Sequence, residues 1–261
     1  MSDKVSLVEV VRNTFVIFRS NSKFFLMLIL ALVVCDFAYV WAQFAPDEYS
    51  PLKLAALFGA LLFGYPWILQ KVMHNSVSLQ RGKSEPLGKS WKFFLGLIAL
   101  SLVSQVLGFV VAFGLSAFAL VLSADLLTAL LGVLSPIVSF LFMVRFGFIL
   151  PAIAVDDQYD YTYAWRLGKK HVLRLFLTII PYFVVTMSLG LLLLPVEGTT
   201  NVTVFTFKTS GLSVVSSILC CLSLMAYSVW YVKLKERYDS INKEEAMSDV
   251  ERKIEKEFNE R

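Results

Sequence analysis

Residues 93–120 read FFLGLIALSLVSQVLGFVVAFGLSAFAL and contain no charged side chain. This run is longer than the roughly 20 apolar residues that an α-helix needs to cross the hydrocarbon core of a bilayer. A helix on the surface of a soluble core keeps a polar stripe along one face, whereas this run is apolar all round. The run therefore predicts a membrane-spanning helix.

Five further runs of the same kind occur along the chain, so the sequence predicts six spans. They cover residues 24–44, 52–72, 93–120, 126–150, 175–196 and 212–232. Overall, 57% of the residues are apolar, 17% are charged and the mean hydropathy is +0.69. Such a composition leaves too few polar residues for the shell of a soluble domain and excludes disorder. The predicted fold is an all-α polytopic membrane protein, and the alternating pattern of a membrane β-barrel is absent from the sequence.

The distribution of basic residues predicts the orientation. Of the 24 Lys and Arg residues, 22 fall before the first span, in loops 71–92 and 145–174, and in the tail after residue 232. The three opposite loops contain only Lys53 and Lys208. Because Lys and Arg are enriched on the cytoplasmic side, both termini are expected there. The first span follows a basic segment but is longer than a signal-peptide core, and we expect it to be retained.

Three spans open with a similar pattern, in which a basic residue and an apolar residue precede Phe-Leu. The basic residues are Lys23, Lys92 and Arg174. Long basic side chains at these places are expected to reach anionic headgroups as interfacial anchors. A genuine repeat would give three parallel helical hairpins around an axis normal to the membrane. The alternative is chance, because basic residues often precede apolar runs at the inner membrane face.

Two terminal segments are predicted to lie outside the spans. In residues 5–20, Val8, Val11, Phe15 and Phe18 recur at helical spacing, which favours an interfacial helix lying flat in the headgroup region. The alternative is a cytoplasmic extension of the first span. Residues 1–234 are therefore assigned to the membrane domain, and residues 235–261 to a charged cytoplasmic tail helix. The Ser248–Glu251 stretch fits a capping box, and the tail is a candidate surface for a protein partner.

Polar residues inside the predicted spans are the candidates for a functional site. They are Asp36, Arg145 and Gln105. An unpaired charge within the membrane costs about 2.5–3.5 kcal/mol on insertion scales, so a charged residue there requires a reason. One interpretation is a polar pathway or binding site within the bundle. The other interpretation is structural: Asp36 and Arg145 pair, or each reaches water at its own side of the membrane.

The sequence predicts no enzyme, metal site or cofactor. It contains no P-loop, no Rossmann glycine motif and no nucleophile elbow. His74 and His171 lie in predicted cytoplasmic segments without a Cys, His or Glu cluster, and the three cysteines fall in apolar runs as packing residues. The net charge of +4 follows the membrane topology and does not indicate nucleic-acid binding.

Residues 148–171 carry a resemblance to a known group. Here a span ends in Pro151-Ala-Ile-Ala-Val155, the acidic pair Asp156-Asp157 follows, and Ala164-Trp-Arg166-Leu-Gly-Lys169 precedes the next span. This arrangement resembles bacterial six-span inner-membrane proteins of the YciC type and the membrane domain fused to some glycerophosphodiester phosphodiesterases. The resemblance implies the fold of a multi-pass protein in a bacterial-type inner membrane more than an activity. Membrane lipid is the expected partner of such a protein.

The sequence is compatible with two functions. The first is a non-enzymatic membrane protein that supports envelope or lipid homeostasis. The second is a transporter of small solutes or ions. The two differ in the bundle interior, because a transporter needs Asp36, Arg145 and the span glutamines to converge on a cavity, whereas a scaffold fills that space with apolar side chains.

Overall fold

The computed structural model describes most of the chain. The described residues are 6–44, 50–117, 134, 137–138, 141–142, 144–157, 166–167, 171–180 and 202–259. Every regular element among them is a helix, which confirms the all-α prediction for this part of the chain.

Four helices among the described residues are long and apolar enough to cross a membrane. The candidate spans are Ser22–Tyr39, Ser50–Arg81, Ser90–Gly114 and Ser213–Ile241. Their outward side chains are also apolar, and Met27, Phe63 and Phe109 are each at least 70% exposed. Side chains of this size are left uncovered over long stretches only where lipid or a partner contacts them. The chain is therefore an α-helical membrane protein.

The six-span count stays a prediction. The first, second, third and sixth predicted spans correspond to these four helices. Predicted spans 126–150 and 175–196 are described only in part. The described residues include 134, 137–138, 141–142 and 144–150 of the first, with α7 (Ile149–Ala154) at its end, and a helical stretch at residues 172–180 at the start of the second.

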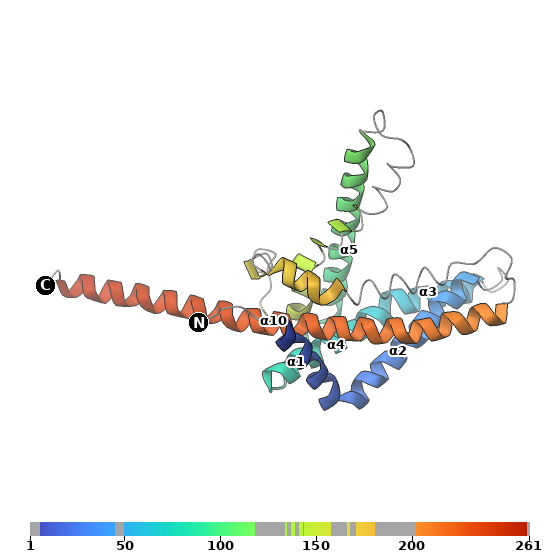
Figure 1. The fold of residues 1–261 in the computed structure, drawn as a ribbon, viewed down its shortest axis with the longest axis horizontal. Helices are drawn as coiled ribbons and strands as arrows, with labels where there is room; N and C mark the ends of the chain where they lie inside the picture. Colours follow the sequence, from blue (N-terminus) through green and yellow to red (C-terminus); the bar gives the residue numbers. More distant parts are fainter. Residues whose placement is uncertain are drawn as a thin grey trace.

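The centre of the molecule is formed where α10 (Val202–Asn259) packs on α2 (Ser22–Phe44) and α4 (Tyr65–Arg81) (Figure 1). In this view α5 (Ser90–Ser116) extends steeply away from α10, and it contacts α4 and α7. The core contains large fully buried side chains, among them Trp230, Tyr231 and Phe148. The Trp230 indole donates a hydrogen bond to Thr178 at 3.1 Å, which ties the 172–180 stretch to α10.

The second span is one continuous helical stretch with a π-helical segment in its middle. It consists of α3 (Ser50–Phe58), η2 (Gly59–Gly64) and α4. A Cβ atom built at Gly64 would lie 2.5 Å from the Cys35 sulfur, so glycine allows η2 to approach α2 closely. A π-helical turn shifts the register of the following residues and is frequent at functional sites. Here it sets the position of Tyr65.

The N-terminal segment forms its own helix, α1 (Leu7–Ser20), which ends at Asn21. Asn21 has φ −135° and ψ 44°, which is not helical, so α1 is not an extension of the first span. Val10, Thr14 and Ile17 form the buried face of α1, and the helix contacts mainly α10. The predicted apolar face is divided: Val8 and Phe15 are exposed, whereas the Phe18 ring stacks on Phe25 at 6.1 Å.

The C-terminal tail is part of α10 and does not form a separate helix. This helix continues without a break across the predicted boundary at residue 235 and through Ser248, so no helix starts at the capping-box sequence. The reason is that residues 212–259 contain no glycine or proline that would end the sixth span. Figure 1 shows the tail projecting well beyond the packed helices.

The three similar openings share a structural position, with one shift in register. Phe25, Phe93 and Leu175 are completely buried, and their amide groups bond to carbonyl groups four residues earlier. The sequence pattern pairs Phe24 with Phe93, whereas the structure makes Phe25 its equivalent. The threefold arrangement itself stays a prediction, because predicted spans 126–150 and 175–196, which belong to the second and third hairpins, are described only in part.

The corrected register extends further into the spans. Three residues after the buried position stand Leu28, Gly96 and Thr178. Leu28 and Thr178 are buried, and a Cβ at Gly96 would lie 2.8 Å from the Ile153 side chain. Four residues beyond, Leu32 and Leu100 are again buried. Burial at this spacing is found in any helix that packs by one face, so the repeat stays a prediction.

Candidate functional site

The Asp36 carboxylate lies within the membrane part of the molecule and accepts three hydroxyl hydrogen bonds. Tyr65 donates to Oδ1, while Ser213 and Ser217 donate to Oδ2 at 2.7 and 3.1 Å. Ser213 and Ser217 are one helical turn apart on α10, so both hydroxyls point to the same side. The Asp36 cluster, defined as these four residues, joins α2, α4 and α10.

These bonds make Asp36 tolerable in an apolar bundle. A hydrogen bond to a charged group contributes about 1.5–3 kcal/mol, so three of them offset the roughly 2.5–3.5 kcal/mol cost of inserting the carboxylate. All three donors are neutral hydroxyl groups. Sequence reasoning missed them, because serine and tyrosine are frequent in membrane helices and gave no distinct signal.

The other predicted polar residues do not gather around Asp36. Arg145 is not among the partners of the Asp36 carboxylate and lies half-buried just before α7. Gln105 is exposed on α5. Gln70 is buried near the inner end of α4, where its amide donates to the Gly88 carbonyl at 2.7 Å. Among the described residues, the convergence that a transporter requires is not observed.

A double-mutant cycle separates these contacts. We expect Asp36→Asn and Ser217→Ala to be coupled by about 0.5–1.5 kcal/mol in the free energy of unfolding, because the two residues share a hydrogen bond. Asp36→Asn and Arg145→Gln should be additive within about 0.5 kcal/mol. Denaturant unfolding in detergent measures both cycles. Strong coupling of Asp36 to Arg145 would contradict the described geometry.

A second polar group lies at the ends of the helices that the predicted topology places on the inner side. We call it the inner polar cluster and define it as Arg81, Glu85, Asp157, Tyr231 and Lys235. Arg81 forms ion pairs with Glu85 and Asp157, both at 2.9 Å. Asp157 also pairs with Lys235 at 2.8 Å and accepts a hydrogen bond from Tyr231 at 2.7 Å. The cluster joins α4, the following loop, the end of α7 and α10.

The loop between α4 and α5 is held closely against α7. Gly88 donates its amide to the Ala154 carbonyl at 3.0 Å and accepts a bond from Gln70. A Cβ at Gly88 would overlap the Ile153 carbonyl oxygen. His74 binds the Glu85 carbonyl at 2.9 Å, which makes its Nε2 the donor. Gly88 therefore lets the loop come near enough for Glu85 and Asp157 to share Arg81.

Opposing effects act on the two carboxyl groups of this cluster. Burial raises the pKa of Asp157, but hydrogen bonds from Lys235, Tyr231 and Arg81 lower it by more, so the net pKa is below the ordinary value. Burial likewise raises the pKa of Glu85, and Arg81 and Lys83 together lower it below its ordinary value. Both groups are ionised near neutral pH, which is the state that the ion pairs require.

The lowered pKa of Asp157 predicts acid sensitivity. Its stabilising contribution is complete above the ordinary carboxyl pKa of about 3.9 and is lost as the pH falls through the lower pKa of the folded state. We expect the melting temperature to decrease from about pH 4 toward pH 2, and to decrease less in Asp157→Asn. Thermal unfolding in detergent across this range measures the difference. Identical pH profiles for both proteins would exclude this role of Asp157.

The sequence indicated this site only in part. The acidic pair Asp156-Asp157 stood out in the motif, but its partners Arg81 and Tyr231 lie 76 and 74 residues away along the chain. Asp156 has φ 52°, a left-handed conformation that turns the chain at this place. The adjacent Asp157 is thereby free to face α4 and α10. No pattern of local spacing encodes that contact.

The predicted anchors all lie in the first turn of their helices. Lys23 is the second residue of α2, Lys92 the third of α5, and Arg174 the third in the 172–180 stretch. A cation at a helix N-terminus is opposed by the helix dipole, by about 0.3–1 kcal/mol. Helix stability therefore does not explain these residues, and their placement fits the predicted anchoring role.

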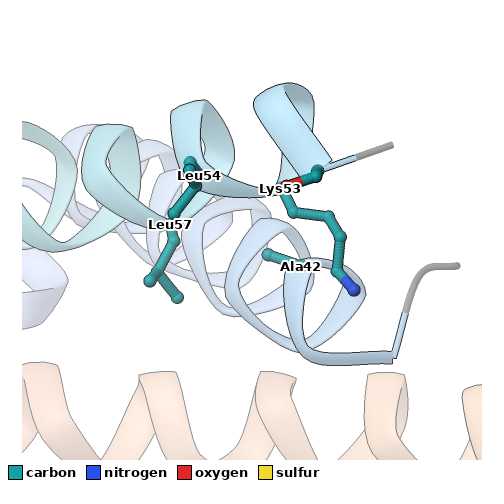
Figure 2. Close-up of a pocket in the computed structure, with 5 residues that line it drawn as sticks. Ala42, Lys53, Leu54 and Leu57 are labelled. Atoms are coloured by element: carbon teal, nitrogen blue, oxygen red, sulfur yellow. The ribbon is translucent and has the colours of Figure 1, made fainter. Parts of the chain in front are cut away.

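An open pocket of about 210 Å³ lies between the C-terminal end of α2 and α3. It is lined by Ala42, Ser50, Lys53, Leu54 and Leu57 (Figure 2). Lys53 is the only charged residue among the described residues that line it, and no member of the inner polar cluster lines the pocket. Among the described residues there is no group of three His, Cys, Asp or Glu side chains that could hold a metal ion.

Comparisons with known proteins identify no relative whose site could be compared with these clusters. No protein-family model, curated protein or solved structure matches the chain.

Proposed function

We propose that this chain is a non-enzymatic, multi-pass protein of a bacterial-type inner membrane that supports envelope or lipid homeostasis. The observation that supports the proposal most directly is the state of Asp36. Its carboxylate is satisfied by Tyr65, Ser213 and Ser217, which are side chains of neighbouring helices. A polar group bonded in this way holds helices together and leaves little need for a bound solute.

The inner polar cluster supports the same proposal. Asp157 connects Arg81 with Lys235 and so fixes the inner end of α10 to that of α4. A transporter that alternates its access must move one group of helices against another. Ion pairs across those helices with mostly buried side chains resist such motion.

Orientation and partners are part of the proposal. Both termini lie in the cytoplasm, membrane lipid covers the exposed apolar faces, and the tail of α10 is available to a protein partner. Its projection beyond the packed helices favours this role for the tail (Figure 1). The resemblance in residues 148–171 to YciC-type proteins points to the same membrane.

A deletion strain tests the proposal. We expect loss of the protein to change phospholipid composition or to increase sensitivity to detergent, and wild-type protein to restore both. Asp157→Asn, which weakens the inner polar cluster, should restore them incompletely, whereas the neighbouring Asp156→Asn should restore them fully. A deletion strain without any envelope or lipid change would overturn this proposal.

The second candidate is an ion transporter. It is favoured by the oxygen-rich surroundings of Asp36 beside the π-helical segment η2, since hydroxyl and carboxylate oxygens can bind protons or hard cations. Proteoliposomes loaded with pH-sensitive and sodium-sensitive dyes distinguish the candidates. Our first proposal expects no flux above that of empty vesicles. Flux that disappears in Asp36→Asn would establish the transporter.

A further inference from the structure

The face of α1 that points away from the protein carries an unusual combination of side chains. Val8, Arg12, Phe15, Val16 and Arg19 are all exposed. At 3.6 residues per turn these five positions fall within an arc of about 100°. They form one stripe along the helix, which we call the α1 stripe.

The opposite face of α1 is occupied by the protein itself. Val10, Thr14 and Ile17 are buried there, and α1 contacts mainly α10. An ion pair between Glu9 and Lys233 fixes the helix on α10. The pKa of Glu9 is lowered by its hydrogen bond from Lys233, so this pair is charged at neutral pH. The α1 stripe is thus presented outward by a helix that cannot rotate freely.

The Arg12 charge helps to lower the pKa of Glu9 on the same helix, but the cations of this region are otherwise open to the surroundings. Arg12, Arg19 and Lys23 are exposed, and no hydrogen bond or ion pair holds their side chains within the described part of the chain. Lys23 is the second residue of α2 and follows the non-helical residue Asn21 by two positions. The next exposed side chains on α2, Leu26 and Met27, are apolar and belong to a candidate span. The positive charges therefore continue from the α1 stripe to the start of a membrane helix.

We propose that the α1 stripe binds the anionic headgroups of the inner membrane leaflet. Arg12, Arg19 and Lys23 contact lipid phosphates, while Val8, Phe15 and Val16 enter the boundary between headgroups and acyl chains. A water-facing surface does not account for Val8, Val16 and Phe15 at 73%, 60% and 53% exposure. A purely apolar partner does not account for two arginines at the centre of the same stripe. An anionic lipid surface matches both.

This inference rests only on the membrane placement of the chain, not on a role in homeostasis. It is also more specific than an interfacial helix in general, because it names the lipid charge and the face. Each basic residue near an anionic surface increases the affinity roughly fivefold, so the preference should be readily measurable. It should weaken at high salt, because headgroup charges are screened.

The test uses the full-length protein in nanodiscs of phosphatidylcholine, with or without one quarter phosphatidylglycerol. Cys35, Cys220 and Cys221 are replaced by alanine, and Val8→Cys carries a polarity-sensitive fluorophore. A small fraction of each lipid carries a quencher near its headgroup. We expect quenching by labelled phosphatidylglycerol to exceed that by labelled phosphatidylcholine at least about threefold, with a blue shift of the emission.

Variants of the α1 stripe give the controls. Arg12→Gln with Arg19→Gln should strongly reduce the preference for phosphatidylglycerol and leave only the share that Lys23 supplies, while Arg12→Lys with Arg19→Lys should keep the preference because it keeps the charges. Both side chains are exposed, so unchanged melting temperatures are expected for both variants. Equal quenching by the two lipids in the parent protein would overturn the proposal. Absence of quenching by either lipid would overturn it as well and would place the α1 stripe against water or protein.

Discussion

The substitution Gly88→Ala is expected to lower the free energy of unfolding by about 3–5 kcal/mol. The added Cβ would overlap the Ile153 carbonyl oxygen, so the main chain of the loop or of α7 must move. Overpacking alone costs about 1–3 kcal/mol. The movement also strains the bonds from Gly88 to Ala154 and from Gln70 to Gly88, and each buried polar group left unsatisfied costs about 1–3 kcal/mol.

Gly114→Ala is the matched control for this substitution. Gly114 lies in α5, and among the described residues no atom outside the local helix backbone comes within 4 Å of the Cβ that would be added. Alanine in an exposed helix is more favourable than glycine by up to about 1 kcal/mol, so this variant should be neutral or slightly more stable. Denaturant unfolding in detergent measures both. A Gly88→Ala protein as stable as Gly114→Ala would show that the loop does not pack on α7 as described.

The second large effect is expected for Asp157→Asn, which should lower the free energy of unfolding by about 2–4 kcal/mol. Removing one partner of a buried ion pair typically costs about 3–5 kcal/mol. We reduce this value because the Asp157 side chain is 20% exposed and its ion pairs are partly screened. Asparagine keeps one acceptor oxygen but loses the charge, so Arg81 and Lys235 remain with a weaker partner.

The neighbouring acid provides the comparison for Asp157. Asp156→Asn removes the same charge, and asparagine tolerates the left-handed backbone at φ 52°. Asp156 is exposed, so this surface substitution should change the free energy of unfolding by less than about 0.5 kcal/mol. If both variants lose the same stability, the effect comes from local charge and not from the inner polar cluster.

The apolar spans could be predicted from the sequence because bilayer thickness imposes their length. The described helices α2 and α10 contain predicted spans 24–44 and 212–232, and α5 covers residues 93–116 of predicted span 93–120. The end of the sixth span could not be predicted, because the change from apolar to charged composition after residue 232 does not interrupt a helix. Only glycine, proline or a capping residue with a local turn would have ended it.

The two polar sites depend on contacts that local patterns do not encode. Asp36 is visible in the sequence as a charge in an apolar run, but Ser213 and Ser217 are 177 and 181 residues away. The repeat shows the same limit at finer scale. Similar letters aligned Phe24 with Phe93, whereas burial and backbone bonding make Phe25 the equivalent residue.

The proposed topology is tested most directly by determining on which side of the membrane the inner polar cluster lies. In the protein without its native cysteines, we place single cysteines at Lys83 and at Gly198 and treat intact cells with an impermeant maleimide. The proposed topology predicts labelling at position 198, and labelling at position 83 only after the cells are permeabilised. Labelling at position 83 from outside intact cells would contradict the cytoplasmic placement of the cluster and, with it, the predicted topology.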